Sequence, residues 1–350
     1  MRILHLASGN RWTGAAAPAF AEVEALRAAG HDAHYAYVGG YKLQAKIGHL
    51  DFTHPIIEKA QNPVTFVRTV NAVERLINHH GFDVVHAHLT YDHWLARVAT
   101  REHRVALART FHARRVLRAD PMTKALLRRT QALFAVNSTF AIDGRDVVFT
   151  PPPVDHRQFD PDGADARPLY GLRDDEKVMM VIGKVAKGRG FEAALETFAA
   201  VRRDVASKLL IVGHGEHRPA LEAHAATLGI TGDVIWAGYH EDDLAEHFRA
   251  ADVLLFTARG SDEGHRAVLE AMACGTVPAT YPIDGVEALL GDHSGDLMAG
   301  QSTPESLAAV VTTLLRRDLT PLRRDVYARS EEFGYAAAAE RLLAAYDGLS

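Results

Sequence analysis

The sequence has 350 residues, a formal net charge of −5, 47% hydrophobic residues and 24% charged residues. This balance excludes the general basic excess of a nucleic-acid binder, and the length favours two domains over one. The one cysteine, Cys274, cannot form an internal disulfide, and no run approaches the roughly 20 apolar residues that cross a membrane.

Short apolar runs alternate with segments of helical periodicity along nearly the whole chain, which is the pattern of parallel sheets with crossover helices. In the first half, strands are predicted at 2–7, 32–38, 83–88, 105–110, 132–137 and 146–150. Residues 150–171 contain five prolines and predict a linker. In the second half, strands are predicted at 177–183, 208–213, 234–238, 252–258 and 276–280. We therefore predict an α/β fold with two doubly wound domains, 1–165 and 166–330, and a last helix at about 331–350 that packs back onto the first.

Two glycine-containing turns follow predicted strands of the second half, where ligands bind in open α/β sheets. The first, GKVAKGRGF at 183–191, carries Lys184, Lys187 and Arg189 ahead of a helix. Backbone N–H groups and three cations in such a turn suit a phosphate, although a solvated surface loop would have the same composition. The second turn, IVGHGEHR, has Gly213 and Gly215 but lacks the third glycine of a dinucleotide fingerprint.

Carboxylates gather in a third stretch, RGSDEGHRAVLEAMACG at 259–275. Asp262 and Glu263 precede a helix, and Glu270 lies inside its otherwise apolar start. An acid near a helix N-terminus also complements the helix dipole, which is the simpler explanation. The spacing of eight residues between Asp262 and Glu270 lets both face one cleft, where carboxylates can accept hydrogen bonds from sugar hydroxyls.

These three stretches, with YHEDDLAEHFRAADVLLFTA, resemble the retaining nucleotide-sugar glycosyltransferases of family 4, which have the GT-B fold. The resemblance extends over essentially the whole chain and is most specific from 178 to 279. It implies two Rossmann-like domains facing a central cleft. It also implies that Lys184 and Arg189 hold the donor diphosphate, in the reverse of the family's order of arginine and lysine. Lys187 is a second candidate for the lysine position.

The same resemblance implies roles for residues beyond the cationic turn. Glu270 would bind the ribose hydroxyls, and Asp262 or Glu263 would lie near the donor sugar. His112, in RTFHARR, would reach the transferred sugar, and Asp155 and Phe159 match the family's linker. The other expected donor-binding residues are Gly14 in the first strand-end turn, Gly183, Gly213, Tyr239 near the base, and Gly264, His265, Arg266, Ala267 and Val268 at the helix start.

Two observations permit a metal, and neither is strong. His86, His88 and His93 include a pair that shares one strand face, but third and fourth ligands are not evident at sensible spacing. The DPD sequence at 160–162 resembles a metal-binding acid pair but lies in the proline-rich linker. We therefore expect no metal and no cofactor.

The opening residues, MRILHLASG, turn polar too soon for a signal peptide, so we expect a cytoplasmic protein. The arginine-rich stretch at 101–130 permits contact with the inner face of an anionic membrane. A solvated helix or a site for an anionic acceptor would have the same charge.

The function expected from the resemblance is metal-independent, retaining transfer of a sugar from a nucleotide-diphosphate donor, such as a UDP- or GDP-sugar. The acceptor, a sugar, a lipid or another small molecule, is open. A sugar-nucleotide epimerase on the same fold is one alternative. A sugar-nucleotide-binding protein without turnover is another, because the two clamp cations are exchanged and Asp262 replaces a glutamate.

Overall fold

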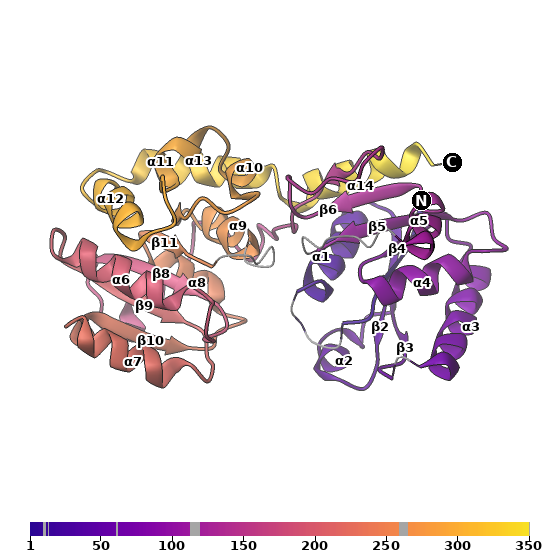
Figure 1. Ribbon diagram of the computed structural model, residues 1–350, viewed down its shortest axis with the longest axis horizontal. Helices are drawn as coiled ribbons and strands as arrows, with labels where there is room; N and C mark the ends of the chain where they lie inside the picture. Colours follow the sequence, from indigo (N-terminus) through magenta and orange to yellow (C-terminus); the bar gives the residue numbers. More distant parts are fainter. Residues whose placement is uncertain (10–11, 13, 61, 113–119, 259–264, 350) are drawn as a thin grey trace. The chain divides into compact units, whose positions relative to one another are not determined.

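The computed structural model describes residues 1–9, 12, 14–60, 62–112, 120–258 and 265–349. The chain forms two compact units (Figure 1). Unit 1 comprises Met1–Pro153 together with Gly334–Ser350, and unit 2 comprises Val154–Phe333.

Unit 1 contains a parallel sheet that has, in the described part of the chain, seven strands in the order β3-β2-β1-β4-β5-β6-β7. The first six follow the order of the dinucleotide-binding fold, which reverses direction between β1 and β4. Its strands are β1 (Arg2–Ala7), β2 (Asp32–Val38), β3 (Thr53–Ile57), β4 (Val84–Ala87), β5 (Ala106–Phe111), β6 (Ala132–Ala135) and β7 (Val148–Phe149). Its helices are α1 (Ala16–Ala28), α2 (Lys42–Ile47), α3 (Pro63–His80), α4 (Thr90–Ala99), α5 (Pro121–Arg128) and α14 (Tyr335–Asp347).

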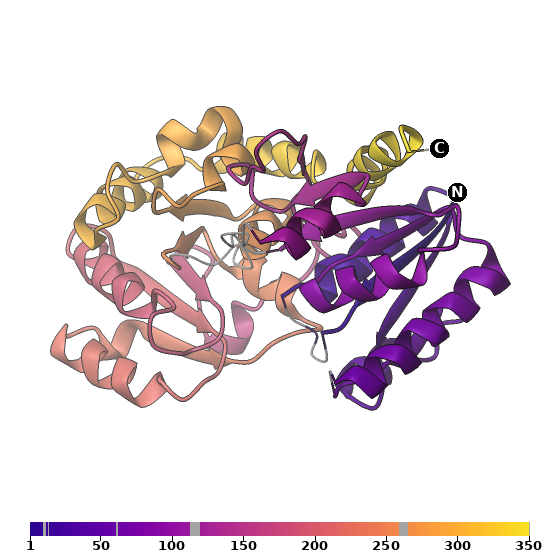
Figure 2. The ribbon, with the colours of Figure 1, turned by 45° about the vertical axis from the view of Figure 1, so that its right-hand side comes forward.

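Alternate residues of these strands face two separate cores, because side chains of a strand point to opposite faces in turn. Ile3 and Ala7 of β1 pack with α1 and α14, whereas Leu4 and Leu6 pack with α3 and α4. The helices accordingly cover both faces of the sheet (Figures 1 and 2). A doubly wound sheet is therefore confirmed for this unit.

The edge strand β3 is the one element of the sheet that the sequence analysis missed. Its sequence, THPII, contains Pro55, which argues against a strand because proline cannot donate a ladder hydrogen bond. At the edge of a sheet one side of the strand needs no partner, so the proline is tolerated there.

Unit 2 has a second parallel sheet, whose described strands run β10-β9-β8-β11-β12. They are β8 (Lys177–Ile182), β9 (Ser207–Val212), β10 (Val234–Gly238), β11 (Val253–Phe256) and β12 (Val277–Thr280). The accompanying helices are α6 (Phe191–Arg202), α7 (Arg218–Thr227), α8 (Leu244–Ala250), α9 (His265–Ala273), α10 (Val286–Leu290), α11 (Ser294–Leu297), α12 (Pro304–Leu315) and α13 (Thr320–Glu331). The predicted second α/β sheet is thus present.

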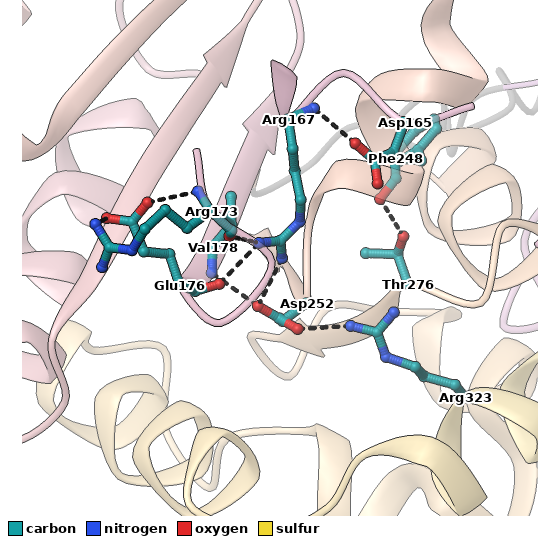
Figure 3. A network of polar contacts seen from close by, with 9 residues as sticks. All are labelled: Asp165, Arg167, Arg173, Glu176, Val178, Phe248, Asp252, Thr276 and Arg323. Carbon is teal, nitrogen blue, oxygen red and sulfur yellow. Dashed lines mark hydrogen bonds and ion pairs between the residues drawn. The ribbon is translucent and has the colours of Figure 1, made fainter. Parts of the chain in front are cut away.

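A buried ion-pair network attaches the proline-rich segment to unit 2 (Figure 3). Asp252, just before β11, pairs through Oδ2 with Nη2 of Arg167 at 3.4 Å and through Oδ1 with Nη2 of Arg323 at 2.6 Å. Its Oδ2 also accepts the backbone N–H of Val178 at 2.8 Å. Arg167 donates to the carbonyl oxygens of Arg173 and Glu176 at 2.7 and 2.9 Å.

These contacts place the division of the chain earlier than the expected boundary after residue 165. The backbone N–H of Ala166 donates to the carbonyl of Glu246, and Arg249 donates to the carbonyls of Asp160 and Ala164. Residues 154–165 therefore belong to unit 2, whereas the sequence analysis assigned them to the first domain. Helix α14 belongs to unit 1 and packs on α1.

Candidate functional site

The turns that follow β8, β9 and β10 are joined backbone to backbone at the carboxyl edge of the unit 2 sheet. The N–H of Gly183 donates to the carbonyl of Val212 at 3.0 Å, and the N–H of Gly213 donates to that of Gly238 at 2.6 Å. The N–H of Val185 donates to the carbonyl of His214 at 3.2 Å. The predicted residues Gly183 and Gly213 are therefore neighbours in one rigid edge.

Two glycines hold the cationic loop, residues 183–190, at its two ends. Gly213 has φ +138°, and a Cβ there would lie 1.9 Å from the carbonyl oxygen of Gly183. Gly190 has φ +84° and caps α6, and a Cβ there would lie 2.6 Å from the carbonyl oxygen of Thr257. The Thr257 hydroxyl donates to the carbonyl of Gly190 at 2.8 Å. The loop thus lies against the end of β11, a contact that the sequence analysis missed.

All three cations of the loop, Lys184, Lys187 and Arg189, are exposed. Nζ of Lys184 lies 3.8 Å from Oε1 of Glu216, but both side chains are more than 60% exposed. Such a solvated pair contributes little stability, so an anion of higher charge can displace it. The loop also precedes the N-terminus of α6, where the helix dipole favours negative charge.

Helix α9 begins at His265 and places Glu270 in the interior. Oε1 of Glu270 accepts a hydrogen bond from Nε of Arg266 at 2.6 Å, and burial raises the pKa of Glu270 more than Arg266 lowers it. His265 is buried, and its ring centre lies 6.3 Å from that of Phe256. Ala267 and Val268 occupy the same first turns of the helix. Asp262, Glu263 and Gly264 lie outside the described residues.

Tyr239 follows β10 and is 65% exposed. Its hydroxyl donates to Oε2 of Glu241 at 2.7 Å, and this bond is the main reason that the pKa of Tyr239 is raised to about 12. Arg266 has a small opposite effect on the same pKa. Tyr239 thus lies at the carboxyl end of β10, and the hydrogen-bonded pair Arg266 and Glu270 lies at the start of α9.

In unit 1, His112 follows β5 and is buried. Its Nε2 lies 2.8 Å from Nδ1 of His88, and burial, with a smaller contribution from Arg109, lowers its pKa to about 3. His112 is therefore a neutral imidazole whose ring is held by His88. Gly14 has φ +57° and precedes α1, as a turn residue.

Asp92 fixes the first strand-end turn of unit 1, a role that no local sequence motif indicates. Its carboxylate accepts the backbone N–H groups of Ser8 and Leu89 at 2.9 and 2.8 Å. Burial raises its pKa to about 6 against these favourable bonds. The turn after β1 and the start of α4 are thus tied together.

The three histidines considered as metal ligands do not all lie together in the structure. His93 is separate, because its Nε2 bonds to the hydroxyl of Thr130 at 2.7 Å. His86 and His88 instead lie beside His5 of β1 and Glu22 of α1, with all four side chains buried. Asp160 and Asp162 lie in the segment before β8 and belong to unit 2.

A pocket of about 420 Å³ opens in unit 1 at the opposite, amino-terminal edge of the sheet. Its lining includes Arg97, Arg101, Arg104 and Arg129, and burial, with smaller contributions from Arg129 and Arg101, lowers the pKa of Arg97. Of these arginines, Arg101, Arg104 and Arg129 belong to the predicted basic stretch at 101–130. No described helix is both long enough and apolar enough to cross a membrane.

Comparison with known proteins gives matches in both halves of the chain. Residues 12–155 match the model described as Glycosyltransferase Family 4, and residues 176–317 match that of Glycosyl transferases group 1. A D-inositol 3-phosphate glycosyltransferase of Segniliparus rotundus is 30% identical over 216 residues, covering 59% of this chain and 48% of that protein. The chain therefore spans about half the length of that relative.

Solved structures resemble nearly the whole chain. A glycosyltransferase from Rickettsia africae has a TM-score of 0.80 at 17% identity, covering 99% of this chain and 98% of its own. Anabaena Alr3699/HepE, solved in complex with UDP, has a TM-score of 0.81 at 14% identity, and the match covers 99% of this chain and 100% of that one. At these identities the likeness concerns the fold.

Proposed function

The chain belongs to the family 4 type of glycosyltransferases and has their GT-B fold, and on that premise we propose that it transfers a sugar from a nucleotide-diphosphate donor. Transfer proceeds with retention of the anomeric configuration and without a divalent cation at the diphosphate. UDP-sugars are the first donors to test, because the Anabaena neighbour binds UDP.

The cationic loop carries this proposal. Its exposed side chains, Lys184 and Arg189, stand between Gly183 and the start of α6, and the backbone is fixed by Gly213 and Thr257. Breaking the bond between sugar and phosphate builds negative charge on the leaving oxygen. Fixed cations and a helix N-terminus stabilise that charge more in the transition state than in the bound donor.

Glu270 and Arg266 provide the nucleoside end of the proposed site. The Glu270 carboxylate accepts one bond from Arg266 through Oε1, and its other oxygen can accept from a ribose hydroxyl. Tyr239, largely exposed just after β10, offers an aromatic face to the base. The roles of Asp262 and Glu263 remain those that the resemblance implies.

His112 is proposed to contact the transferred sugar. A neutral ring does not repel the positive charge that develops on the sugar, and burial keeps this imidazole neutral at physiological pH. The incoming hydroxyl attacks the face from which the diphosphate departs, and the leaving phosphate oxygen takes its proton. This arrangement retains the configuration without a covalent enzyme nucleophile.

The test compares three single variants of the cationic loop. Lys184→Ala and Arg189→Ala should each lower kcat by about 10²–10³, with a smaller loss of donor affinity, by analogy with removal of one oxyanion donor. Lys187→Ala, in the same loop, is the matched control and should be nearly unchanged. If Lys187→Ala is severe and Arg189→Ala is mild, the assignment of the second clamp cation is wrong.

A second experiment separates the proposed activity from its alternatives, neither of which the comparisons favour. A transferase releases UDP as the sugar moves to acceptor or water, whereas an epimerase returns an intact UDP-sugar and a binding protein releases nothing. Added Mg²⁺ or Mn²⁺ should leave the rate of UDP release unchanged. A strict requirement for either ion would contradict metal-independent transfer.

A further inference from the structure

Four buried side chains of unit 1 converge on one point between the sheet and α1. Oε2 of Glu22 lies 3.7 Å from Nδ1 of His5, 3.8 Å from Nε2 of His88 and 4.0 Å from Nδ1 of His86. Nδ1 of His5 lies 2.9 Å from Nε2 of His88. These four residues are called the histidine–glutamate cluster below.

The register of the sheet creates the cluster. Strands β1 and β4 are parallel neighbours in which His5 stands directly opposite His86. His88 is two residues beyond His86 and therefore faces the same side. Glu22 comes from α1, on the helix face that otherwise buries Ala19, Val23 and Leu26. Three separate segments thus supply imidazole and carboxylate groups to one interior position.

The spacing of the four atoms fits a tetrahedral ion. Zinc binds imidazole nitrogen and carboxylate oxygen at about 2.0–2.2 Å, so two ligands of a regular tetrahedron lie about 3.4 Å apart. The four distances given above, from 2.9 to 4.0 Å, lie on both sides of that value, and all four ligand atoms lie within 4.8 Å of one another. The side chains would draw together around an ion for all four atoms to coordinate it.

One oxygen of the Glu22 carboxylate has no hydrogen-bond donor among the described residues. Oε2 of Glu22 is buried and accepts no hydrogen bond from the described part of the chain. A buried carboxylate is costly unless it is paired, neutralised or bound to a metal. A metal ion would satisfy this oxygen directly.

Neighbouring groups already orient two of the imidazoles as ligands. Nε2 of His86 lies 2.7 Å from the Thr110 hydroxyl, and Nδ1 of His88 lies 2.8 Å from Nε2 of His112. Metal-bound histidines commonly donate from the other ring nitrogen in this way, which fixes the tautomer. Nδ1 of His86 lies 2.5 Å from the Tyr346 hydroxyl of α14, so an ion bound at this nitrogen would displace that hydrogen bond.

We propose that His5, Glu22, His86 and His88 bind one divalent transition-metal ion, with Zn²⁺ as the ion best suited to three imidazoles and a carboxylate in tetrahedral spacing. Four protein ligands in a buried position make a closed, structural site. An ion on Nε2 of His88 places that ring's proton on Nδ1, which then donates to Nε2 of His112. The site therefore also positions His112, and it is independent of catalysis at the diphosphate.

The experiment measures metal in the full chain, purified from cells grown with Zn²⁺ and dialysed. One zinc per chain is expected by mass spectrometry, and replacement by Co²⁺ should give the visible absorption of a tetrahedral ion. Glu22→Gln keeps the shape of the side chain but supplies a poor ligand. It should lower the affinity for Zn²⁺ by more than the roughly 10–100-fold that loss of an outer-shell partner costs.

His93→Gln is the matched control, because this buried histidine of α4 bonds to Thr130 and lies outside the cluster. It should retain one zinc. His54→Ala tests the group of His34, His54 and His80, which is the other set of three histidines in the described residues and in which His34 is buried. Zinc lost from His54→Ala but kept by Glu22→Gln would overturn the proposal.

Glu22→Leu gives a second readout that does not depend on metal counting. If the cluster binds an ion, this variant loses the ion, and its Tm falls to or below that of the wild-type chain in EDTA. If the cluster is a metal-free hydrogen-bond network, EDTA leaves the wild-type Tm unchanged. Glu22→Leu would then raise Tm, because it removes a buried acid without a partner. That result would refute the site, whatever the transferase assay shows.

Discussion

Substituting Gly190 by alanine tests whether the loop that carries the cations is held by contact with the end of β11. Gly190 has φ +84°, and a Cβ would lie 2.6 Å from the carbonyl oxygen of Thr257. Gly188, two residues earlier, has φ +76°, but no heavy atom lies within 4 Å of its Cβ position. The two glycines thus share a backbone conformation and differ in their surroundings.

The expected magnitudes follow from these geometries. Alanine in the left-handed region costs about 1–2 kcal/mol, which is the whole effect expected for Gly188→Ala. Gly190→Ala adds displacement of Thr257, at about 1–3 kcal/mol for overpacking, and loss of the hydrogen bond from its hydroxyl, at about 1 kcal/mol. The free energy of unfolding of unit 2 should therefore fall by about 3–6 kcal/mol in Gly190→Ala.

Tryptophan fluorescence during urea unfolding can report unit 2 alone. Of the three tryptophans, Trp236 lies in β10, whereas Trp12 and Trp94 lie in unit 1 and can be replaced by phenylalanine. In this background the fluorescence follows the unfolding of unit 2 alone, so the two units are not fitted together as one unfolding transition. Equal losses for Gly188→Ala and Gly190→Ala would refute the argument that Thr257 fixes the loop.

Three further outcomes are expected. Glu270→Ala should weaken UDP binding in calorimetry by about 1.5–3 kcal/mol. Because burial raises the pKa of Glu270, the affinity of the wild-type chain for UDP should already fall as the pH decreases toward the ordinary carboxyl range, and Glu270→Ala should lose this pH dependence. If Glu270→Ala binds UDP with unchanged affinity, Glu270 has only a structural role. Asp252→Asn should destabilise unit 2 by about 3–5 kcal/mol, since it leaves buried Arg167 underpaired, and a loss below about 1 kcal/mol would contradict this. If the basic stretch at 101–130 contacts an anionic membrane, reversing Arg101 and Arg104 to glutamate should lower cosedimentation with anionic vesicles at least about tenfold, at about 1 kcal/mol per basic residue, and unchanged cosedimentation would contradict that contact.

The sequence predicted most of the sheets because buried parallel strands are continuous apolar runs, which depend on no distant residue. The stretch KVMMVI became β8 as expected, whereas THPII did not read as a strand because of Pro55. Similarly, the cationic loop was identifiable because its glycines and cations are contiguous. Their tertiary support from Thr257 was not, since the two segments are 67 residues apart.

The histidine–glutamate cluster shows the same limit more clearly. A sequence search for metal ligands at short spacing grouped His93 with His86 and His88, whereas the structure selects partners by strand register and helix face. A usable signal was present: His5 and His86 occupy inward positions of neighbouring apolar strands. Glu22 is an acid on the apolar face of α1. Recognising it requires knowing that β1 and β4 are adjacent.

The return of α14 to unit 1 has a consequence for synthesis of the protein on the ribosome. Residues 1–153 emerge first, yet the surface formed by α1 and the sheet is covered by Leu342 and Tyr346. At about 5–20 residues per second, roughly 10–40 s separate the two segments. During this interval the nascent first unit exposes that apolar surface, and we expect it to need chaperones. A circular permutant that begins at Gly334 would supply the helix first and remove the delay.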